Sequence, residues 1–368
     1  MFDRRLVQNF DWILLFLLIL IVTISLTNLY SATYPIRDAG GDKIFSKQVY
    51  WFLMGFVVLF MVTFFDYHLL ERGGYSIYAF SIILLIMVLI IGRVHSGSQR
   101  WLGIGGFVFQ PSELAKISMV IILAKYFTNN SEFSDYRLRD LWQPFLLTAV
   151  PCVLIVKEPD LGSGLLLAII SFSIMLFMKI RWKSLFILVC TSLIAAYPLW
   201  RFVLKEYQQK LILTFLRPEI DPLGSGYHII QSKIAVGSGL LWGKGFLKGT
   251  QTGLHFLPEQ HTDFAFSVLA EEWGFAGVVF LLSVYLFLIF RIIYIAKNSK
   301  DRFGTIFSIG IASIIFWQLV INVCMTIGLM PVVGIPLPLL SYGGSSVVTT
   351  MLGIGILMNI SMRRFMFQ

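Results

Sequence analysis

Long apolar runs rich in Leu, Ile, Val and Phe alternate with short polar segments along the whole chain. Within each run the apolar residues are continuous, so the runs predict helices and not the alternating strands of a membrane barrel. A bilayer core about 30 Å thick requires about 20 such residues in each spanning helix. We therefore predict an all-α, polytopic integral membrane helix bundle with about ten transmembrane helices, near residues 12–30, 50–66, 76–92, 112–127, 143–156, 162–179, 184–200, 270–295, 304–328 and 343–362.

The longest segment between predicted helices is residues 201–262, which is rich in Gly, Lys and aromatic residues. Its 240–248 part mixes Trp, Phe and Lys as interfacial segments do, so we expect the segment to fold back onto the membrane surface. The fifth helix is short and the junction at 157–161 is tight, so the fifth and sixth helices could form a bent pair. No internal duplication is visible, and we interpret residues 1–368 as a single membrane domain that contains this large loop.

Composition and charge agree with a membrane protein: 57% of residues are apolar and 13% are charged, and a soluble domain carries roughly twice that charge. Ten helices place both termini on one side, and among the short loops those on that side carry most of the Lys and Arg residues. The positive-inside rule then makes both termini cytoplasmic and residues 201–262 extracytoplasmic, across a cytoplasmic (inner) membrane. The net charge of +9 suits anionic headgroups or an anionic substrate, and no nucleic-acid motif accompanies it.

Four polar constellations interrupt the apolar pattern. The first combines Arg100 and Trp101 with a helix start at Pro111, after which Glu113 and Lys116 lie three residues apart on one helix face. Lys116 lies roughly 7 Å below the helix start at 1.5 Å per residue, where ionisable groups are costly and usually functional. The two could form a structural ion pair, or Lys116 and Arg100 could bind a phosphate, to which Arg offers bidentate contacts and Lys a point charge.

The second constellation, Lys157-Glu158-Pro159-Asp160, fills the tight turn between the fifth and sixth predicted helices. Asp160 is placed to be the N-cap of the sixth helix, which is a structural role. Glu158 has no such role and could line a cavity.

The third constellation stands where the long loop re-enters the membrane, at His261 and Asp263, and Glu271 and Glu272 follow. Asp263 could simply cap the next helix. It could also act as a catalytic carboxylate, because the boundary between water and hydrocarbon suits a lipid-linked substrate. A metal site of His255, His261 and Asp263 is a third alternative, although no HExxH spacing supports it.

The fourth constellation is the Pro/Gly-rich turn 334–346, which contains Ser341 and opens the last predicted helix. It could be a re-entrant packing element or a substrate contact. The chain contains no Walker motif, GxGxxG or GxSxG, so ATP hydrolysis, nicotinamide chemistry and serine hydrolysis have no support, and we expect no organic cofactor.

Together the four constellations resemble the SEDS family (shape, elongation, division and sporulation), and the resemblance covers nearly the whole chain. Residues 257–263 (LPEQHTD), 271–274 (EEWG) and 330–336 (MPVVGIP) are most similar to the elongation-type members, RodA. Division-type members, FtsW, tend to differ at Gln260, Trp273 and residues 331–333.

The resemblance implies a peptidoglycan glycosyltransferase that polymerises lipid II into glycan strands on the outer face of the cytoplasmic membrane during cell elongation. The family's essential aspartate falls on Asp263, and a carboxylate there suits a general base that deprotonates the acceptor sugar hydroxyl. Arg100, Lys116 or a divalent cation, Mg²⁺ or Mn²⁺, would neutralise the leaving pyrophosphate. The predicted substrate-binding residues are Arg100, Trp101, Glu113, Lys116, Lys157, Glu158, Asp160, His261 and Ser341.

The implied partners are lipid II, the nascent glycan strand, a class B penicillin-binding protein that supplies the transpeptidase, and other elongation-complex proteins. A lipid II flippase, which is a transporter, is the main alternative, since buried charge in a helix bundle suits transport equally well. The absence of a visible inverted repeat argues against it. A structural scaffold would need no buried Glu113–Lys116 pair, and an FtsW-type division polymerase is the alternative within the family.

Overall fold

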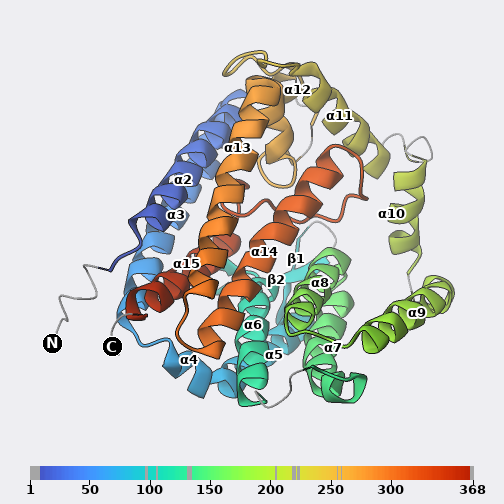
Figure 1. Cartoon of the computed structure of the whole chain (residues 1–368). Coiled ribbons are helices and arrows are strands. Elements are labelled where there is room, and N and C mark those ends of the chain that lie inside the picture. The colour runs from blue at the N-terminus through green and yellow to red at the C-terminus, as the bar shows by residue number, and fades with distance from the viewer. Residues whose placement is uncertain are drawn as a thin grey trace.

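The computed structural model describes residues 9–95, 98–104, 107–130, 135–203, 205–217, 221, 224–254, 256–257 and 259–364. They fold mainly into helices, with one small sheet between α5 and α6 (Figure 1). The helices are α2 (Trp12–Thr33), α3 (Asp42–Phe64), α4 (His68–Arg72), α5 (Gly74–Ile91), α6 (Pro111–Asn129), α7 (Trp142–Lys157), α8 (Leu161–Phe177), α9 (Trp182–Pro198), α10 (Glu206–Leu216), α11 (Ser225–Ser238), α12 (Thr250–Gly253), α13 (Ala265–Lys297), α14 (Arg302–Thr326) and α15 (Gly344–Arg363).

Each of the ten predicted helix ranges coincides with one of these helices. Among the described residues, seven helices are long and apolar enough to cross a membrane: α2, α3, α5, α7 with the turn before it, α13, α14 and α15. The chain is therefore a polytopic membrane helix bundle. α8 and the first part of α9 are apolar but shorter. α7 and α8 are two separate helices that pack against each other across a tight turn.

The all-α prediction missed a three-stranded antiparallel sheet, formed by β1 (Arg93–His95), β2 (Ser98–Ile104) and β3 (Phe107–Phe109). Trp101 of β2 pairs with Arg93, and Leu102 pairs with Phe109. Strands of three to seven residues give a weak signal beside apolar runs of about 20 residues, which is why the helical pattern obscured them. The sheet positions one of the candidate site residues, because β2 carries Arg100.

The core of the bundle lies around α14 and α15, the most buried of the candidate spans. α15 packs along α3, and glycines permit the close approach of the two helices. A Cβ on Gly355 would lie 2.8 Å from the backbone oxygen of Leu59, and one on Gly55 would lie 2.9 Å from the Met351 side chain. Small residues at such crossings allow the close packing that stabilises helix pairs in lipid, where the hydrophobic effect between helices is absent.

Both ends of the described chain lie on one side of the molecule, which we call the terminal side (Figure 1). Asp11 is the N-cap of α2, and its carboxylate pairs with Arg291 of α13 at 2.9 Å and accepts a hydrogen bond from Ser361 of α15 at 3.4 Å. These contacts join the start of the first helix to the last turns of α13 and α15. We call the opposite side of the bundle the distal side.

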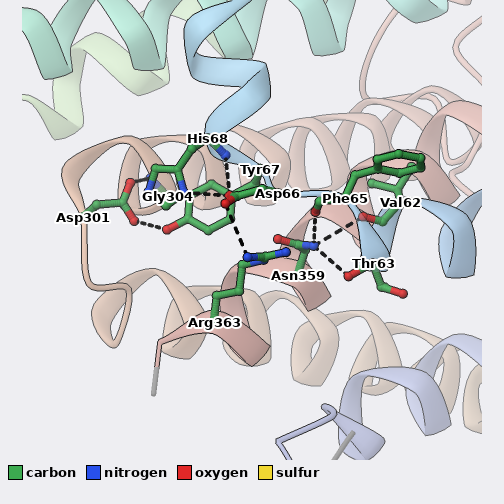
Figure 2. Close-up of polar contacts among 10 residues, drawn as sticks. All are labelled: Val62, Thr63, Phe65, Asp66, Tyr67, His68, Asp301, Gly304, Asn359 and Arg363. Carbon is green, nitrogen blue, oxygen red and sulfur yellow. Dashed lines mark hydrogen bonds and ion pairs between the residues drawn. The ribbon is translucent and has the colours of Figure 1, made fainter. Parts of the chain in front are cut away.

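A second polar cluster on the terminal side surrounds the C-terminal end of α3 (Figure 2). The Asn359 amide of α15 donates to the carbonyls of Val62 at 3.3 Å and Thr63 at 2.7 Å, and to that of Phe65. The last carbonyls of a helix have no partner within the helix, and lipid offers none. Asn359 therefore satisfies the end of α3 from a neighbouring span.

The turn after α3 is held by three further contacts of this cluster. Arg363 pairs with Asp66 at 3.3 Å, the His68 ring lies 2.7 Å from Asp66, and the Tyr67 hydroxyl donates to Asp301. Asp301 is also the N-cap of α14. These contacts on the terminal side thus connect α3, α4, α14 and α15.

The distal side is covered by the segment between α9 and α13, which is folded and not a linker. α11 lies across the distal ends of α13 and α14, and Ser232 connects all three. Its hydroxyl lies 2.8 Å from the Ser267 hydroxyl of α13 and donates to the Thr326 carbonyl of α14 at 2.6 Å. α9 and α10 lie to one side of the bundle (Figure 1).

Candidate active site

Asp263 lies in the turn immediately before α13, on the distal side. The N-cap residue of α13 is Phe264, which makes no side-chain cap hydrogen bond. Asp263 therefore does not cap the helix, and its partly exposed carboxylate has no hydrogen-bond donor among the described residues. Its backbone is fixed, because the Asn322 amide of α14 donates to the Asp263 carbonyl at 3.0 Å and to the Ile335 carbonyl at 2.8 Å.

The loop between α14 and α15 forms one wall beside Asp263. Gly334 has a φ of +68°, and a Cβ there would lie 3.4 Å from Oδ2 of Asp263. The Tyr342 amide donates to the His261 carbonyl at 2.9 Å, and the two rings meet edge to face with centroids 5.8 Å apart. The third and fourth constellations of the sequence therefore form one site.

The turn between α7 and α8 closes against the same loop. A Cβ on Gly162 would lie 2.3 Å from the Val333 carbonyl oxygen, so only glycine permits this approach. Asp160 is the N-cap of α8 and accepts from the Ser163 amide at 3.0 Å, as the sequence predicted. The second constellation is thereby placed beside the fourth.

Arg100 joins the first constellation to the second. Its guanidinium donates to the Pro159 carbonyl at 2.5 Å and lies 3.8 Å from the Asp160 carboxylate. The side-chain amide of Gln110, the residue before α6, donates to the Asp160 carboxylate at 3.4 Å. The backbone amide of Gln110 donates to the Ser345 hydroxyl at 3.1 Å. The four constellations, spread over some 250 residues of sequence, therefore meet on the distal side of the bundle.

The pKa of Asp263 is raised from 3.8 to about 6, mainly because burial disfavours the charged carboxylate. Charge repulsion from Glu259 and Asp160 contributes to this rise, and attraction to Arg100 opposes it. The order of these effects shows that Asp263 is controlled mainly by desolvation, which disfavours the charged carboxylate. A carboxylate with a pKa near 6 is mostly ionised at neutral pH and is a stronger base than an ordinary aspartate.

Glu158 is fully buried, and neither of its carboxylate oxygens has a hydrogen-bond partner among the described residues. Its pKa is raised to about 8, mainly by burial and in smaller part by repulsion from Asp160, and Arg100 acts in the opposite direction. An unpaired buried carboxyl is costly, so its presence beside Arg100 and Asp160 points to a functional role rather than a packing role. Burial also lowers the pKa of His261, which favours the neutral imidazole.

Lys116 and Glu113 form the predicted pair, 2.8 Å apart on α6, and both are buried, with Lys116 only 4% exposed. They line a small cavity together with Gln318 of α14, whose side-chain nitrogen has no hydrogen-bond partner in the described part of the chain. The pair lies about one helical turn from the start of α6, near Gln110. Its role in binding an anion stays a prediction.

The other predicted residues have different surroundings. Trp101 is half-buried on β2, and Lys157 is exposed at the end of α7. Ser341 is buried, and its hydroxyl accepts from the Leu337 amide at 2.9 Å, so it shapes the loop beside Asp263.

Asn322 and Glu259 were not singled out by the sequence. A buried Asn inside an apolar span was a usable signal, because polar groups in lipid need partners. Glu259 is exposed and has a positive φ of 50°, and only its position in the folded turn connects it with Asp263.

Within the described parts of the chain, the one grouping of His, Cys, Asp and Glu with ligand spacing is His68, Glu71 and Asp301. It lies on the terminal side, separated from Asp263 by the length of α13. His255, named in one sequence hypothesis, lies outside the described residues.

Known proteins provide a comparison for this geometry. The family model for FtsW, RodA and SpoVE, described as a cell cycle protein, matches residues 11–365. The peptidoglycan glycosyltransferase MrdB of Escherichia coli K12 is 40% identical over 342 residues, which cover 92% of this chain and 91% of that protein. The crystal structure of the rod shape determining protein RodA from Thermus thermophilus superposes with a TM-score of 0.72, at 30% identity, over 97% of this chain and 98% of that one. A chain from a peptidoglycan synthase complex, studied for its coordination of polymerization and crosslinking, gives a TM-score of 0.83 at 32% identity, with coverage of 97% and 98%.

Proposed function

The chain belongs to the FtsW/RodA/SpoVE family and is a peptidoglycan glycosyltransferase of the RodA type; we propose that it polymerises lipid II with Asp263 as its general base. The observation that carries the proposal is the meeting of four distant polar segments around one carboxylate. That carboxylate has no donor among the described residues, a pKa raised to about 6, and a place at the end of a membrane span.

The reaction joins two lipid-linked sugars. The acceptor hydroxyl loses its proton to Asp263 as its oxygen attacks the anomeric carbon of the donor sugar, and the bond to the lipid diphosphate breaks. A base is most effective when its pKa lies near the working pH, and the raised pKa of Asp263 meets this condition. The diphosphate is already a good leaving group, so a second carboxylic acid is not required, unlike in glycoside hydrolysis.

Negative charge develops on the leaving diphosphate, and fixed positive charge stabilises it. We assign this role first to Arg100, whose guanidinium is partly exposed and directed by Pro159 and Asp160. Lys116 is a second candidate, although its burial and its pairing with Glu113 mean that it would act from inside the bundle.

A divalent cation, Mg²⁺ or Mn²⁺, would add charge at the diphosphate. Glu158 is the residue suited to hold it, because both of its buried oxygens have no partner among the described residues. A cation there would favour the ionised form of Glu158 and so reverse the effect of burial on its pKa. The proposal is tested by chelation followed by restoration with each metal.

For the membrane arrangement we propose ten crossings, with α6, α8 and α9 added to the seven apolar helices, and with both termini in the cytoplasm. The distal side, including the large loop 201–262 and Asp263, would then face outward from a cytoplasmic membrane. The basic loops of the terminal side support this orientation.

We further propose a class B penicillin-binding protein as partner, with its single span packed on the lipid-facing surface of the last three helices. The similarity to a chain of a peptidoglycan synthase complex supports this proposal. Co-purification should recover such a transpeptidase and raise the polymerisation rate.

The direct test incubates purified protein with lipid II and detects glycan polymer on a gel. Asp263→Asn should abolish polymer, because general base catalysis is worth about 10²–10⁴-fold. Asp42→Asn is the matched control, since Asp42 is an exposed carboxylate at the start of α3 that pairs with Arg37 at 2.9 Å, away from Asp263. Polymer formed by Asp263→Asn at close to the parental rate would remove the catalytic assignment.

The same assay separates the polymerase from a lipid II flippase. A flippase moves lipid II across vesicles without forming polymer, and its activity would survive Asp263→Asn. Polymer formation by the pure protein excludes a function limited to transport or scaffolding.

A further inference from the structure

α13 is broken near its distal end. Gly274 has φ 64° and ψ −164°, which is not helical, yet the helix continues on both sides. The break removes the helical bonds that the amides of Phe275 and Ala276 would make to the carbonyls of Glu271 and Glu272. At the edge of a bilayer such freed groups need new partners.

Residues 240–245 supply all four partners. The amides of Lys244 and Gly245 donate to the carbonyls of Glu271 and Glu272, both at 3.0 Å. The amides of Phe275 and Ala276 donate to the carbonyls of Leu240 at 2.8 Å and Leu241 at 3.0 Å. Residues 240–245 therefore provide the hydrogen bonds that α13 lacks at the break.

Glycines make this close approach sterically feasible. A Cβ on Gly243 would lie 2.1 Å from the Glu272 carbonyl oxygen, and one on Gly239 would lie 2.0 Å from that of Ala270. A side-chain contact then secures the segment, because the buried Glu271 carboxylate accepts from Lys244 at 2.7 Å and from the Thr250 amide at 2.8 Å. The segment and α13 thus form one rigid unit.

The tip of this segment carries large apolar side chains that nothing in the described chain covers. Leu240 is 80% exposed, Leu241 is 64% exposed and Trp242 is 82% exposed. Phe275, on the adjoining face of α13, is also exposed. An apolar group of this size on a soluble surface would favour aggregation or binding.

The level of the tip relative to the bilayer follows from α13 itself. Arg291 pairs with Asp11, the N-cap of the first span, and so marks the terminal boundary of the membrane. From Arg291 to Gly274 is about 17 residues, or roughly 26 Å at 1.5 Å per residue, close to the thickness of a bilayer core of about 30 Å. The break and the tip bonded to it therefore lie at the distal boundary.

We propose that the tip Leu240-Leu241-Trp242 inserts into the lipid headgroup and acyl boundary of the distal leaflet and anchors the first turns of α13 there. Trp suits this boundary, and leucines bury their side chains just below it. Because the anchored turns begin two residues after Asp263, the anchor sets the height of Asp263 relative to the membrane surface. A lipid-linked substrate presents its diphosphate at that height.

The test places a nitroxide spin label at position 242 in a protein without the three native cysteines, reconstituted in lipid nanodiscs. Trp242→Cys should collide more often with oxygen, which concentrates in lipid, than with a water-soluble nickel complex. Gly253→Cys is the control, since Gly253 is exposed on the same loop and a Cβ there meets nothing within 4 Å. It should show the reverse preference.

A label at 242 that is as accessible to nickel as the label at 253 would overturn the proposal. So would protection from both reagents, because that result means contact with protein. The measurement needs no catalysis, so its failure leaves the proposed polymerase function untouched. A functional arm compares Trp242→Ser with Trp242→Phe: the serine variant should lose polymerisation severalfold in bilayers, and the phenylalanine variant should retain it.

Discussion

Replacing Glu259 by Gln should move the acid limb of the pH–activity profile to lower pH. Asp263 must be ionised to accept a proton, so kcat/KM should rise with pH and reach half its plateau near pH 6. With a pKa of about 6, roughly 90% of Asp263 is ionised at pH 7 and roughly 10% at pH 5, so the rate should fall about tenfold between them. An aspartate with the ordinary pKa of 3.8 would give nearly equal rates at both values.

The direction of each shift follows from the charges around Asp263. Glu259 raises the pKa of Asp263 by repulsion, so Glu259→Gln should lower it. Arg100 lowers the pKa by attraction, so Arg100→Gln should raise it and move the limb to higher pH, in addition to any loss of rate. Thr262→Val is the control, because it removes the 3.1 Å hydrogen bond from Thr262 to Glu259 without changing a charge.

The assay is polymerisation of lipid II by purified protein between pH 5 and pH 8 at constant ionic strength. Titration of the substrate is the same for every variant, so a difference between two pH–activity profiles reflects a difference in the pKa of an enzyme group. The assignment of Asp263 as base would be refuted if Glu259→Gln and the parent had the same midpoint on the acid side of the profile. It would also be refuted if the activity did not change between pH 5 and pH 7. A limb that moves with Thr262→Val would indicate a change in the turn rather than in charge.

The remaining predictions concern stability and arrangement. Asn359→Leu leaves the last carbonyls of α3 unpaired, which costs about 1–3 kcal/mol, so the melting temperature should fall while the base-dependent pH profile stays the same. Lys116→Met leaves the Glu113 carboxylate buried and unpaired, at a cost of about 3–5 kcal/mol; a folded variant with normal turnover would exclude Lys116 from anion binding. Glu271→Gln should weaken the hold on residues 244–251 and speed their proteolysis, and unchanged cleavage would contradict that role. Gly253→Cys should react with an impermeant thiol reagent in intact cells, and labelling only after lysis would reverse the proposed orientation.

The apolar helices could be predicted from the sequence because the formation of each span depends only on residues within that span. A segment in lipid must pair its own backbone groups and present about 20 apolar residues, so the pattern of Leu, Ile and Phe predicted the ten apolar helices. It did not predict the eight residues by which α3 begins early, or the shorter helices α4, α10 and α12. The N-cap at Asp160 and the Glu113–Lys116 pair were predictable for the same reason, since partners three residues apart meet within one turn.

The sequence placed the four polar constellations at helix ends but did not establish that they meet. Contacts such as Asn322 to Asp263, Gly162 to Val333 and Arg100 to Asp160 depend on how helices from distant parts of the chain cross. The break at Gly274 also had no local signal, because the bonds that repair it come from residues 240–245. In a bilayer the lipid tails are as apolar as the helix surfaces, so hydrophobicity decides which segments insert, and close packing and polar contacts in the tertiary structure decide which of them touch.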